Sequence, residues 1–472
     1  MKQPHFFNTL GRRLEPLEPL KSGAVRIYTC GPTVYDRAHI GNLRTFLFED
    51  LLNRSLQFMG YEVTQVMNLT DVDDRTIQRS QDTGKSLEEV TAPVTAAFFS
   101  DLDALGIQRA EHYPRATEHI PEMIELIERL IAAGYAYESE GSIFFRIVED
   151  EDYGRLSGFD LGQVRQGERV VADDYDKEDV RDFVLWKAAK PGEPAWDSPW
   201  GSGRPGWHIE CSAMSMKYLG ESFDIHCGGV DNIFPHHENE IAQSESATGK
   251  PFVHTWIHAE HLIVDGQKMS KSLGNFYTLG DLVEQGAEPR AIRYLMLSVH
   301  YRDKLNFTLE ALDAATGALK RLDEMRFRLD HSSESGQGES TLVPASDEMV
   351  DAFETALCND LNLSEALAAV FGLVREVNTA IDRGALVPGD KEHVTGALAR
   401  IDEVINVLDP EAWRSGVGTD GLTDEAIDAL IAEREQARAD REWGRADEIR
   451  DQLQAGGIVL EDARDGTRWK RQ

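Results

Sequence analysis

The stretch Val25–Leu69, VRIYTCGPTVYDRAHIGNLRTFLFEDLLNRSLQFMGYEVTQVMNL, has the pattern of a strand, a helix and a second strand. Its first six residues alternate in polarity and are rich in β-branched and aromatic types, which favours a strand. A second strand is predicted at about Glu62–Leu69. Between the strands, apolar residues recur at helical spacing and Gly60 is placed to end the helix; they are Leu43, Phe46, Leu47 and Leu51. This βαβ unit predicts an α/β fold with a parallel sheet.

The loop between the first strand and the helix carries candidate ligands. Cys30 ends the strand, at the edge where open α/β sheets bind ligands, although a free cysteine is more commonly a buried apolar residue. Gly41 lies at the predicted helix start, where backbone N–H groups and the helix dipole favour a phosphate. His39 could donate to that phosphate. A lone histidine is more often structural, so this role depends on a second phosphate-binding element.

A second stretch, Gly203–Glu240, concentrates cysteine, histidine and glutamate: GRPGWHIECSAMSMKYLGESFDIHCGGVDNIFPHHENE. His236 and Glu240 are four residues apart, just after a proline that suits the first turn of a helix. On a helix they would share one face at a spacing that suits two zinc ligands, and Cys211 would add a thiolate. A lone HxxxE pair is usually ordinary helix surface, and the adjacent pair His237–Glu238 could serve structure only. The added cysteine favours a metal site.

The second phosphate-binding candidate is the loop Lys268–Ser272, KMSKS. Its lysines, Lys268 and Lys271, could neutralise charge that moves during phosphoryl or nucleotidyl transfer. Lysine–serine loops are often no more than solvated surface. In a chain this acidic, a local basic loop is less ordinary.

The composition bounds the class of protein. With 472 residues and 41% hydrophobic content, the chain has room for about three domains with sizeable cores. No apolar run approaches the ~20 residues of a membrane helix, and the N-terminus lacks the features of a secretion signal. The four cysteines are therefore expected to be free thiols or metal ligands in a cytoplasmic protein. The net charge of −34 would repel nucleic acid at low salt, so we expect activity to hold or rise near molar KCl.

The rest of the chain divides by pattern. Residues 112–197 look like an insertion with a helix near Pro121–Ala133 and short strands around Ser142–Ile147. After a linker at His331–Pro344, the pattern is helical and predicts a bundle. Two basic sets could contact the phosphates of a nucleic acid or lie on solvated helix faces: Arg290, Arg293, Arg302 and Lys304, and a stripe expected on a single helix at Arg434, Arg438, Arg441 and Arg445.

KMSKS, the segment HIGN at His39–Asn42, GWHIECSAM and FPHHENE occur in this order. Together they resemble the class I aminoacyl-tRNA synthetases, and within that class the cysteinyl-tRNA synthetase family. The resemblance runs from about Val25 to Phe307 and returns at GTRW, Gly466–Trp469. One departure is visible, because the class signature usually reads HIGH and this chain has Asn42. Asparagine can donate a hydrogen bond but cannot carry a positive charge.

The resemblance implies an α/β fold in which a Rossmann-like parallel-sheet catalytic domain carries an insertion. A C-terminal helical bundle and a small α(+β) anticodon-binding module then follow. The expected parts are the first catalytic half at residues 1–110, the inserted acceptor-stem domain at 111–200, the second catalytic half at 201–310, the bundle at 311–410 and the anticodon module at 411–472.

The resemblance also implies the chemistry. Such an enzyme activates L-cysteine with ATP and Mg²⁺ to cysteinyl-adenylate, then passes cysteine to the 3′ end of tRNA-Cys. One Zn²⁺ per chain would bind the substrate thiolate, because a soft metal prefers sulfur to the hydroxyl of serine. A monomer without a membrane partner is expected. Carried over by position, the catalytic residues are His39, Lys268 and Lys271; the substrate and ATP ligands are Gly41, Asn42, Thr70, Trp207, His226, Asp231 and Lys271; the metal ligands are Cys30, Cys211, His236 and Glu240.

Three rival functions remain open at this stage. A ligase that joins cysteine to an amino sugar would share adenylation and zinc, but would not need the ~160 residues that follow the catalytic half. A non-catalytic tRNA-binding paralogue would be expected to lose ligands or lysines, whereas only Asn42 departs here. A structural zinc protein would leave KMSKS unexplained.

Overall fold

The structure is a computed structural model that describes residues 2–159, 179, 181–270, 273–414, 424–439, 443–455, 458–463 and 466–471. Two compact units make up the chain, Met1–Asp409 and Pro410–Gln472. Lys271, Arg441 and most of the acidic loop expected at 173–182 lie outside the described residues.

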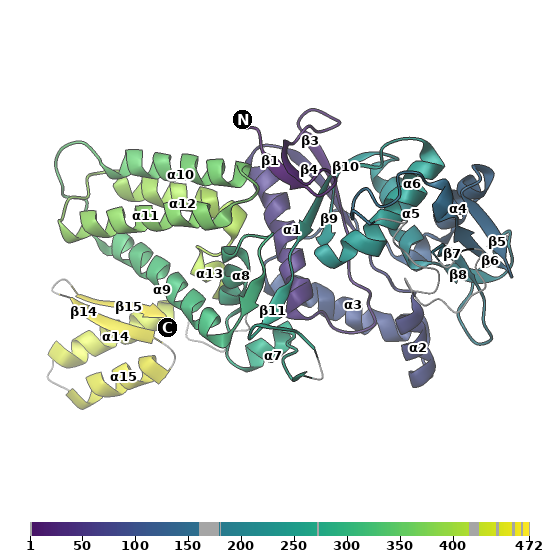
Figure 1. Ribbon diagram of the computed structural model, residues 1–472. Coiled ribbons are helices and arrows are strands. Elements are labelled where there is room, and N and C mark those ends of the chain that lie inside the picture. The colour runs from purple at the N-terminus through teal and green to yellow at the C-terminus, as the bar shows by residue number, and fades with distance from the viewer. Residues whose placement is uncertain are drawn as a thin grey trace. The chain divides into compact units, whose positions relative to one another are not determined.

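A four-stranded parallel sheet forms the centre of the first unit, in the order β10-β9-β3-β4 (Figure 1). The predicted βαβ unit is confirmed: β3 (Ala24–Thr29) and β4 (Glu62–Met67) are joined by α1 (Ile40–Phe58). The other two strands come from the second half, β9 (Phe223–Gly229) and β10 (Val253–Ala259). All seven residues of β9 are buried, as expected for a central parallel strand covered on both faces.

Helices and short strands around this sheet complete the catalytic half. A hairpin of β1 (His5–Asn8) and β2 (Arg13–Pro16) pairs antiparallel. A small sheet orders its strands β12-β11-β13, which places the KMSKS segment at the end of β12. The elements are α2 (Asp74–Thr83), α3 (Leu87–Ala104), α5 (Trp207–Leu219), α6 (Glu238–Thr248), β11 (Leu262–Val264), β12 (Gln267–Lys268), α7 (Leu279–Glu284), α8 (Pro289–Ser298) and β13 (Leu305–Phe307).

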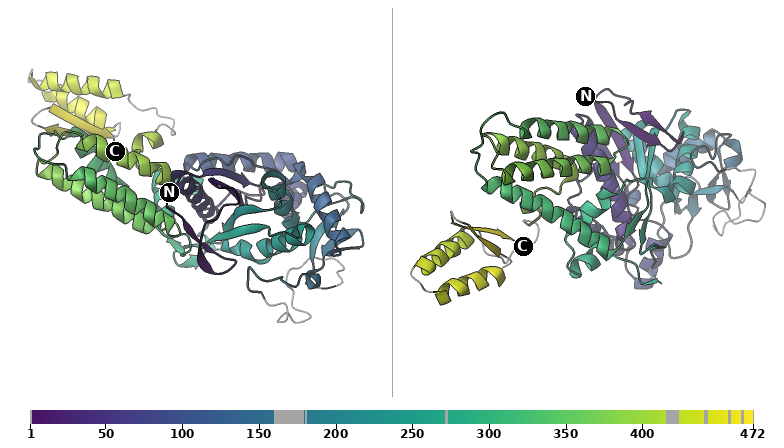
Figure 2. Two further views of the ribbon diagram at one scale, coloured as in Figure 1. Left: turned by 90° about the horizontal axis from the view of Figure 1, so that it is seen from above. Right: turned by 60° about the vertical axis from the view of Figure 1, so that its left-hand side comes forward.

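The inserted segment forms its own antiparallel sheet, ordered β5-β6-β7-β8. The predicted helix and strand appear close to their expected bounds, as α4 (Ile120–Ala132) and β6 (Ser142–Phe145). The remaining strands are β5 (Ala136–Ser139), β7 (Phe183–Ala188) and β8 (Gly203–Pro205). Both views place this sheet and the helical bundle on opposite sides of the central sheet (Figures 1 and 2).

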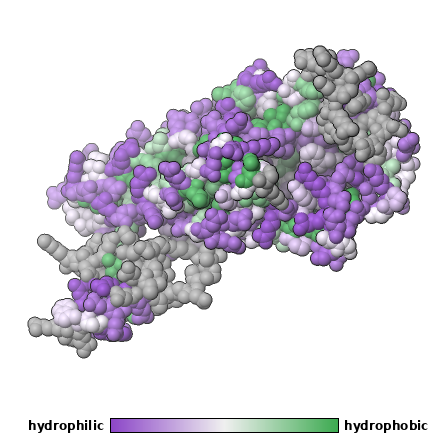
Figure 3. All heavy atoms as spheres, turned by 60° about the horizontal axis from the view of Figure 1, so that its bottom comes forward, coloured by the Kyte–Doolittle hydropathy of each residue, from purple (hydrophilic) through white to green (hydrophobic). Residues whose placement is uncertain are grey.

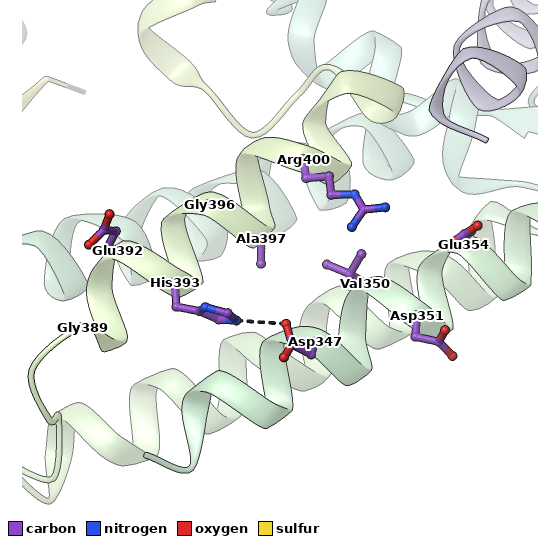
Figure 4. Close-up of a pocket in the computed structure, with 10 residues that line it drawn as sticks. All are labelled: Asp347, Val350, Asp351, Glu354, Gly389, Glu392, His393, Gly396, Ala397 and Arg400. Atoms are coloured by element: carbon purple, nitrogen blue, oxygen red, sulfur yellow. Dashed lines mark hydrogen bonds and ion pairs between the residues drawn. The ribbon is translucent and has the colours of Figure 1, made fainter. Parts of the chain in front are cut away.

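The predicted helical bundle follows, made of α9 (Leu309–His331), α10 (Leu342–Cys358), α11 (Leu363–Asp382) and α12 (Asp390–Ile405). A groove of about 700 Å³ lies between α10 and α12, with Asp347, Asp351 and Glu392 on its rim (Figure 4). His393 spans it and lies 3.0 Å from Asp347. The face drawn in Figure 3 is mostly hydrophilic where it is coloured, as the high charge requires.

Two predicted basic surface residues are part of the core instead. Arg293 is completely buried and its Nη2 lies 2.6 Å from Oδ2 of Asp50 on α1. Arg290 is 6% exposed and pairs with Asp323 on α9 at 2.7 Å. The expectation that they face tRNA or solvent was wrong, because α8 packs between α1 and the bundle and a buried guanidinium requires an acidic partner.

The second unit contains α13 (Pro410–Arg414), α14 (Asp424–Ala439) and α15 (Trp443–Ala455), then a hairpin of β14 (Ile458–Ala463) and β15 (Gly466–Arg471). The predicted single-helix arginine stripe was wrong, because α14 and α15 are separate helices. Arg434 is buried, and Arg445 pairs with Glu433 at 2.7 Å. Among the described residues, no helix has the length and apolar character needed to cross a bilayer.

Candidate active site: a Cys–His–Glu cluster and the start of helix α1

Six thiol, imidazole and carboxylate side chains meet at the C-terminal edge of the central sheet. Cys30 follows β3 directly, His226 lies within β9, and Cys211 lies near the start of α5. His236 and His237 come from the kinked segment Ile233–His237, in which Phe234 has extended backbone angles, and Glu240 comes from α6, which follows it. Parallel strands end at the same edge, so the topology brings together residues that are 210 positions apart in sequence, Cys30 and Glu240.

Their ligand atoms form two overlapping groups. Within each group, all the ligand atoms lie within 4.8 Å of one another. The first is Cys30, Cys211, His236 and Glu240, the four ligands that the resemblance implied. The second shares Cys30 and Glu240 but uses His226 and His237. The structure therefore brings the four expected residues together and adds two histidines.

Glu240 is the centre of both groups. His226 Nε2 lies 3.0 Å from its Oε2, and His236 Nε2 lies 3.1 Å from its Oε1. All three side chains are buried, and Glu240 Oε1 makes no hydrogen bond. Burial raises the pKa of Glu240 to about 8, although nearby His236 opposes the rise. A buried carboxylate oxygen without a hydrogen bond is costly unless a cation completes its surroundings.

The Cys30 thiol, like the Glu240 carboxyl group, would need a nearby cation in order to ionise. Burial is the main cause that raises the pKa of Cys30 well above its ordinary value, and the neighbouring Cys211 adds to the rise. Burial lowers the pKa of His226 to about 3, which keeps its imidazole neutral. Thiolates, neutral imidazoles and a carboxylate are the donors that Zn²⁺ takes in proteins. The residues present therefore fit a zinc ion.

Outer hydrogen bonds orient the histidines. His236 Nδ1 lies 2.9 Å from His208 Nδ1, and Trp207 stacks on the His236 ring at a centroid distance of 4.3 Å. His237 Nδ1 lies 2.8 Å from His258 Nε2 on β10. Such partners fix the tautomer and the ring orientation of metal-binding histidines. Trp207 itself is 43% exposed, so it can reach a ligand.

The helix start of α1 forms the second part of the site. His39 is its N-cap: Asn42 N–H donates to His39 Nδ1, and His39 N–H donates to Asn42 Oδ1, both at 3.2 Å. A Cβ on Gly41 would come within 3.0 Å of the His39 ring and 3.3 Å of Met269. The glycine thus lets the HIGN turn and the KMSKS segment approach each other. Lys268 is exposed at the end of β12.

Asn42 has a structural role at this helix start. Its side-chain oxygen closes a capping box with His39, which satisfies two of the free N–H groups at the helix start. Ile40 N–H donates to Tyr277 O at 3.0 Å, so Gly41 N–H is the donor of this turn that is left for an anion.

Two predicted substrate residues lie at different depths. Thr70 follows β4, is 2% exposed and donates a hydrogen bond to Glu210 Oε2 at 2.8 Å. Asp231 is exposed in the 3-10 turn Val230–Asn232 and is not part of either ligand group. A Cβ on Gly229 would lie 2.4 Å from Asp231 Oδ1, so a glycine is needed beside it.

Comparison with known proteins agrees with this geometry. The chain is 50% identical over 466 residues to a protein named cysteine–tRNA ligase from Solibacter usitatus, with 99% of each chain covered. It is 48% identical over 473 residues to the protein of that name from Chlamydia pneumoniae, covering 99% of this chain and 98% of the relative. The chain belongs to the cysteine–tRNA ligase family.

Three family descriptions match successive parts of this chain. "tRNA synthetases class I (C) catalytic domain" matches residues 16–317, "DALR domain" matches 352–409, and "Cysteinyl-tRNA ligase anticodon binding domain" matches 420–469. The catalytic match contains the whole cluster and both phosphate-binding elements. The other two matches fall on the helical bundle and the C-terminal unit.

Solved structures of other class I synthetases share the fold. Methionyl-tRNA synthetase of Mycobacterium tuberculosis, in complex with methionyl-adenylate, superposes with a TM-score of 0.59 at 15% identity, covering 84% of this chain and 96% of that one. LeuRS of Agrobacterium radiobacter K84, in a ternary complex with tRNA, gives 0.60 at 12% identity, covering 86% of each chain. At such identities the likeness concerns the fold alone, and it confirms the predicted α/β class.

Sequence reasoning did not assign His237 and His258 to the site. His237 had been given a structural role, yet its Nε2 lies 3.2 Å from Cys30 Sγ. No spacing rule connects it to a cysteine 207 residues away. Its neighbour Glu238 has the structural role that was expected, because it accepts hydrogen bonds from the backbone of Gly154 and Ser157.

Proposed function

We propose that the protein activates L-cysteine with ATP, forming cysteinyl-adenylate, and transfers the cysteinyl group to the 3′ end of tRNA-Cys. The observation that carries the proposal is the buried group of Cys30, Cys211, His236 and Glu240 beside the α1 helix start. A thiol-selecting site and a phosphate-binding site are the two requirements of cysteine activation. Membership of the cysteine–tRNA ligase family supports the same activity.

The α1 helix start would hold the nucleotide. The Gly41 N–H would donate to a phosphate oxygen, and His39 lies at the cap. The carboxylate of cysteine would attack the α-phosphate in line, with pyrophosphate leaving. His39, Lys268 and Lys271 would stabilise the charge that develops on the phosphate oxygens, with Mg²⁺ bound to ATP. This arrangement gives catalysis by positioning and electrostatics rather than by a covalent intermediate.

The cluster would supply selectivity. Cysteine and serine differ little in size, so packing alone separates them poorly. A Zn²⁺ ion bound by Cys30, Cys211, His236 and Glu240 would hold the substrate sulfur as a thiolate, which serine cannot imitate. Glu240 is the ligand best able to yield its place, because its carboxylate also contacts His226. Thr70, Trp207 and Asp231 would line the rest of the cysteine pocket.

The family match of residues 420–469 to an anticodon-binding domain favours tRNA over an amino sugar as acceptor. We further propose that the protein acts as a cytoplasmic monomer.

The decisive experiment is cysteine-dependent ATP–pyrophosphate exchange across a salt series, with serine as the control amino acid and zinc quantified. We expect exchange with cysteine alone and one zinc per chain. Adding tRNA-Cys or an amino sugar then identifies the acceptor. Absence of exchange in the zinc-loaded protein at every salt concentration would contradict the proposal.

A further inference from the structure

A chain of buried hydrogen bonds connects the neighbourhoods of the two candidate thiol ligands. Gly31 N–H donates to Asn68 Oδ1 at 2.9 Å, and Asn68 Nδ2 donates to Thr70 Oγ1 at 3.1 Å. Thr70 Oγ1 then donates to Glu210 Oε2 at 2.8 Å. Gly31 follows Cys30 and Glu210 precedes Cys211, so the chain runs from one cysteine to the other.

One end of this chain is fixed by the backbone. A Cβ on Gly31 would lie 1.7 Å from the carbonyl oxygen of Asn68, so the two main chains are in direct contact. Thr70 N–H donates to Pro32 O at 3.1 Å, and Val34 N–H donates to Thr70 O at 3.1 Å. The loop that carries Cys30 and the end of β4 therefore form one rigid piece.

The other end depends on a side chain. Glu210 joins α5 to that piece through its hydrogen bond with Thr70. Glu210 is 1% exposed, Asn68 and Thr70 are each 2% exposed, and Glu210 Oε1 has no hydrogen-bond partner. In a buried site this hydrogen bond is strong, and no water competes for its donor or acceptor. It therefore restrains the position at which α5 begins. Cys211 is the next residue on α5.

We propose that Asn68 and Glu210 are positioning residues for thiol recognition, because they set the separation of the Cys30 and Cys211 sulfur atoms. This inference rests on the proposed function. Zinc–sulfur bonds are about 2.3 Å long, and the ligands around a zinc ion are arranged nearly as a tetrahedron. A small shift of α5 would therefore weaken binding by both thiolates. Loss of either residue should impair zinc binding first, and cysteine binding more than ATP binding.

The test measures zinc affinity by chelator competition without any substrate. We expect Glu210→Leu, which offers no acceptor to the Thr70 hydroxyl, and Asn68→Ala to bind zinc about 10–100-fold more weakly than wild type, the range for residues that orient metal ligands. The matched control for Asn68→Ala is Asn53→Ala. Asn53 is a buried asparagine on α1 that donates to Gln65 at 2.8 Å. This control should not change the affinity more than about threefold.

Cobalt substitution supplies a second readout, because thiolate-to-cobalt absorption reports the two sulfur ligands directly. Thr70→Val removes the central hydroxyl and should alter this spectrum, whereas Thr70→Ser keeps the hydroxyl and should preserve it. In exchange assays, Glu210→Leu should raise the KM for cysteine at least about fivefold with little change in the KM for ATP. This pair of Thr70 variants keeps the test informative if a Glu210 variant does not fold.

The outcomes separate the two proposals. A wild-type protein that binds no zinc and does not activate cysteine contradicts the proposed function. A zinc-binding, active wild type together with unchanged affinity and cobalt spectrum in Glu210→Leu and Thr70→Val overturns the positioning role alone.

Discussion

His226 Nε2 lies 3.0 Å from Glu240 Oε2, and both side chains are completely buried. This contact places a histidine of the central sheet against the carboxylate that both candidate ligand groups share. An ion could in principle be bound by Cys211 and His236 or by His226 and His237, with Cys30 and Glu240 in either case. The two arrangements differ in the number of thiolates.

The first prediction distinguishes these groups. Cys211→Ser should abolish stoichiometric zinc binding and lower cysteine-dependent exchange at least about 100-fold, because a thiolate ligand of the metal and its negative charge are both lost. His237→Gln should retain zinc. Plasma emission spectroscopy on dialysed protein measures the metal, and Cys227→Ser is the matched control because this buried cysteine belongs to neither group. Zinc loss in His237→Gln with retention in Cys211→Ser would assign the ion to the second group.

The second prediction concerns Asn42, whose oxygen closes the capping box with His39. Asn42→Asp keeps an oxygen that can accept the capping hydrogen bond. It also adds a negative charge, which would repel a phosphate bound at this helix start. The thermal midpoint should therefore be preserved while the KM for ATP rises about tenfold, equivalent to roughly 1.4 kcal/mol. Asn42→Ala should instead destabilise the helix start by about 1 kcal/mol.

Differential scanning fluorimetry and ATP-dependence of pyrophosphate exchange measure these two effects separately. An Asn42→Asp enzyme with an unchanged KM for ATP would show that this turn does not contact the nucleotide.

A third prediction follows from the buried pair of Arg293 and Asp50. Arg293→Met removes the cation and leaves a buried carboxylate with one fewer partner, so the free energy of unfolding should fall by about 3–5 kcal/mol. Backbone oxygens of Ile405 and Leu105 also lose their donor. Urea denaturation monitored by tryptophan fluorescence measures the loss. Arg383→Met, at an exposed position after α11, should change stability by less than about 0.5 kcal/mol.

The fourth prediction concerns pH. Burial raises the pKa of Asp101 on α3 to about 6, although Arg37 opposes the rise. Between about pH 4 and 6 the folded state therefore binds more protons at this position than the unfolded chain, so its contribution to stability falls as pH rises through this window. Asp101→Asn removes this loss, so the variant should be more stable than wild type at pH 7.

The measurement is the difference in unfolding midpoint between variant and wild type at pH 4 and at pH 7. The difference should grow with pH for Asp101→Asn and stay flat for Asp313→Asn, an exposed aspartate on α9. Equal differences at both pH values for Asp101→Asn would contradict the assignment.

Local pattern was enough for much of the architecture. The βαβ unit at Val25–Leu69 was predicted correctly because alternation and helical spacing are written within a few turns of chain. The same holds for α4 and for the helical bundle. The arginine stripe failed because a regular spacing carries no sign that Arg434 and Arg438 lie on α14 while Arg445 lies on another helix, α15.

Burial was not predictable from spacing. Arg290 and Arg293 are basic residues of the kind that line a tRNA-binding surface. The packing of α8 against α1 and the bundle nevertheless buries them. A charged residue is placed inside only if a distant partner is supplied, and Asp50 is 243 residues away from Arg293. Such pairs are visible only once the chain is folded.

The sequence by itself determined the α/β class, the order of the parts and the four residues of the first ligand group, because residue types at short spacing and motifs that carry a family resemblance are local information. Tertiary structure alone decided that Glu240 also meets His226, that His237 reaches Cys30, and that Asn68, Thr70 and Glu210 connect the two thiols. The physical reason is that parallel strands end at one edge, which gathers residues from β3, β4, β9 and α5 into a single buried site.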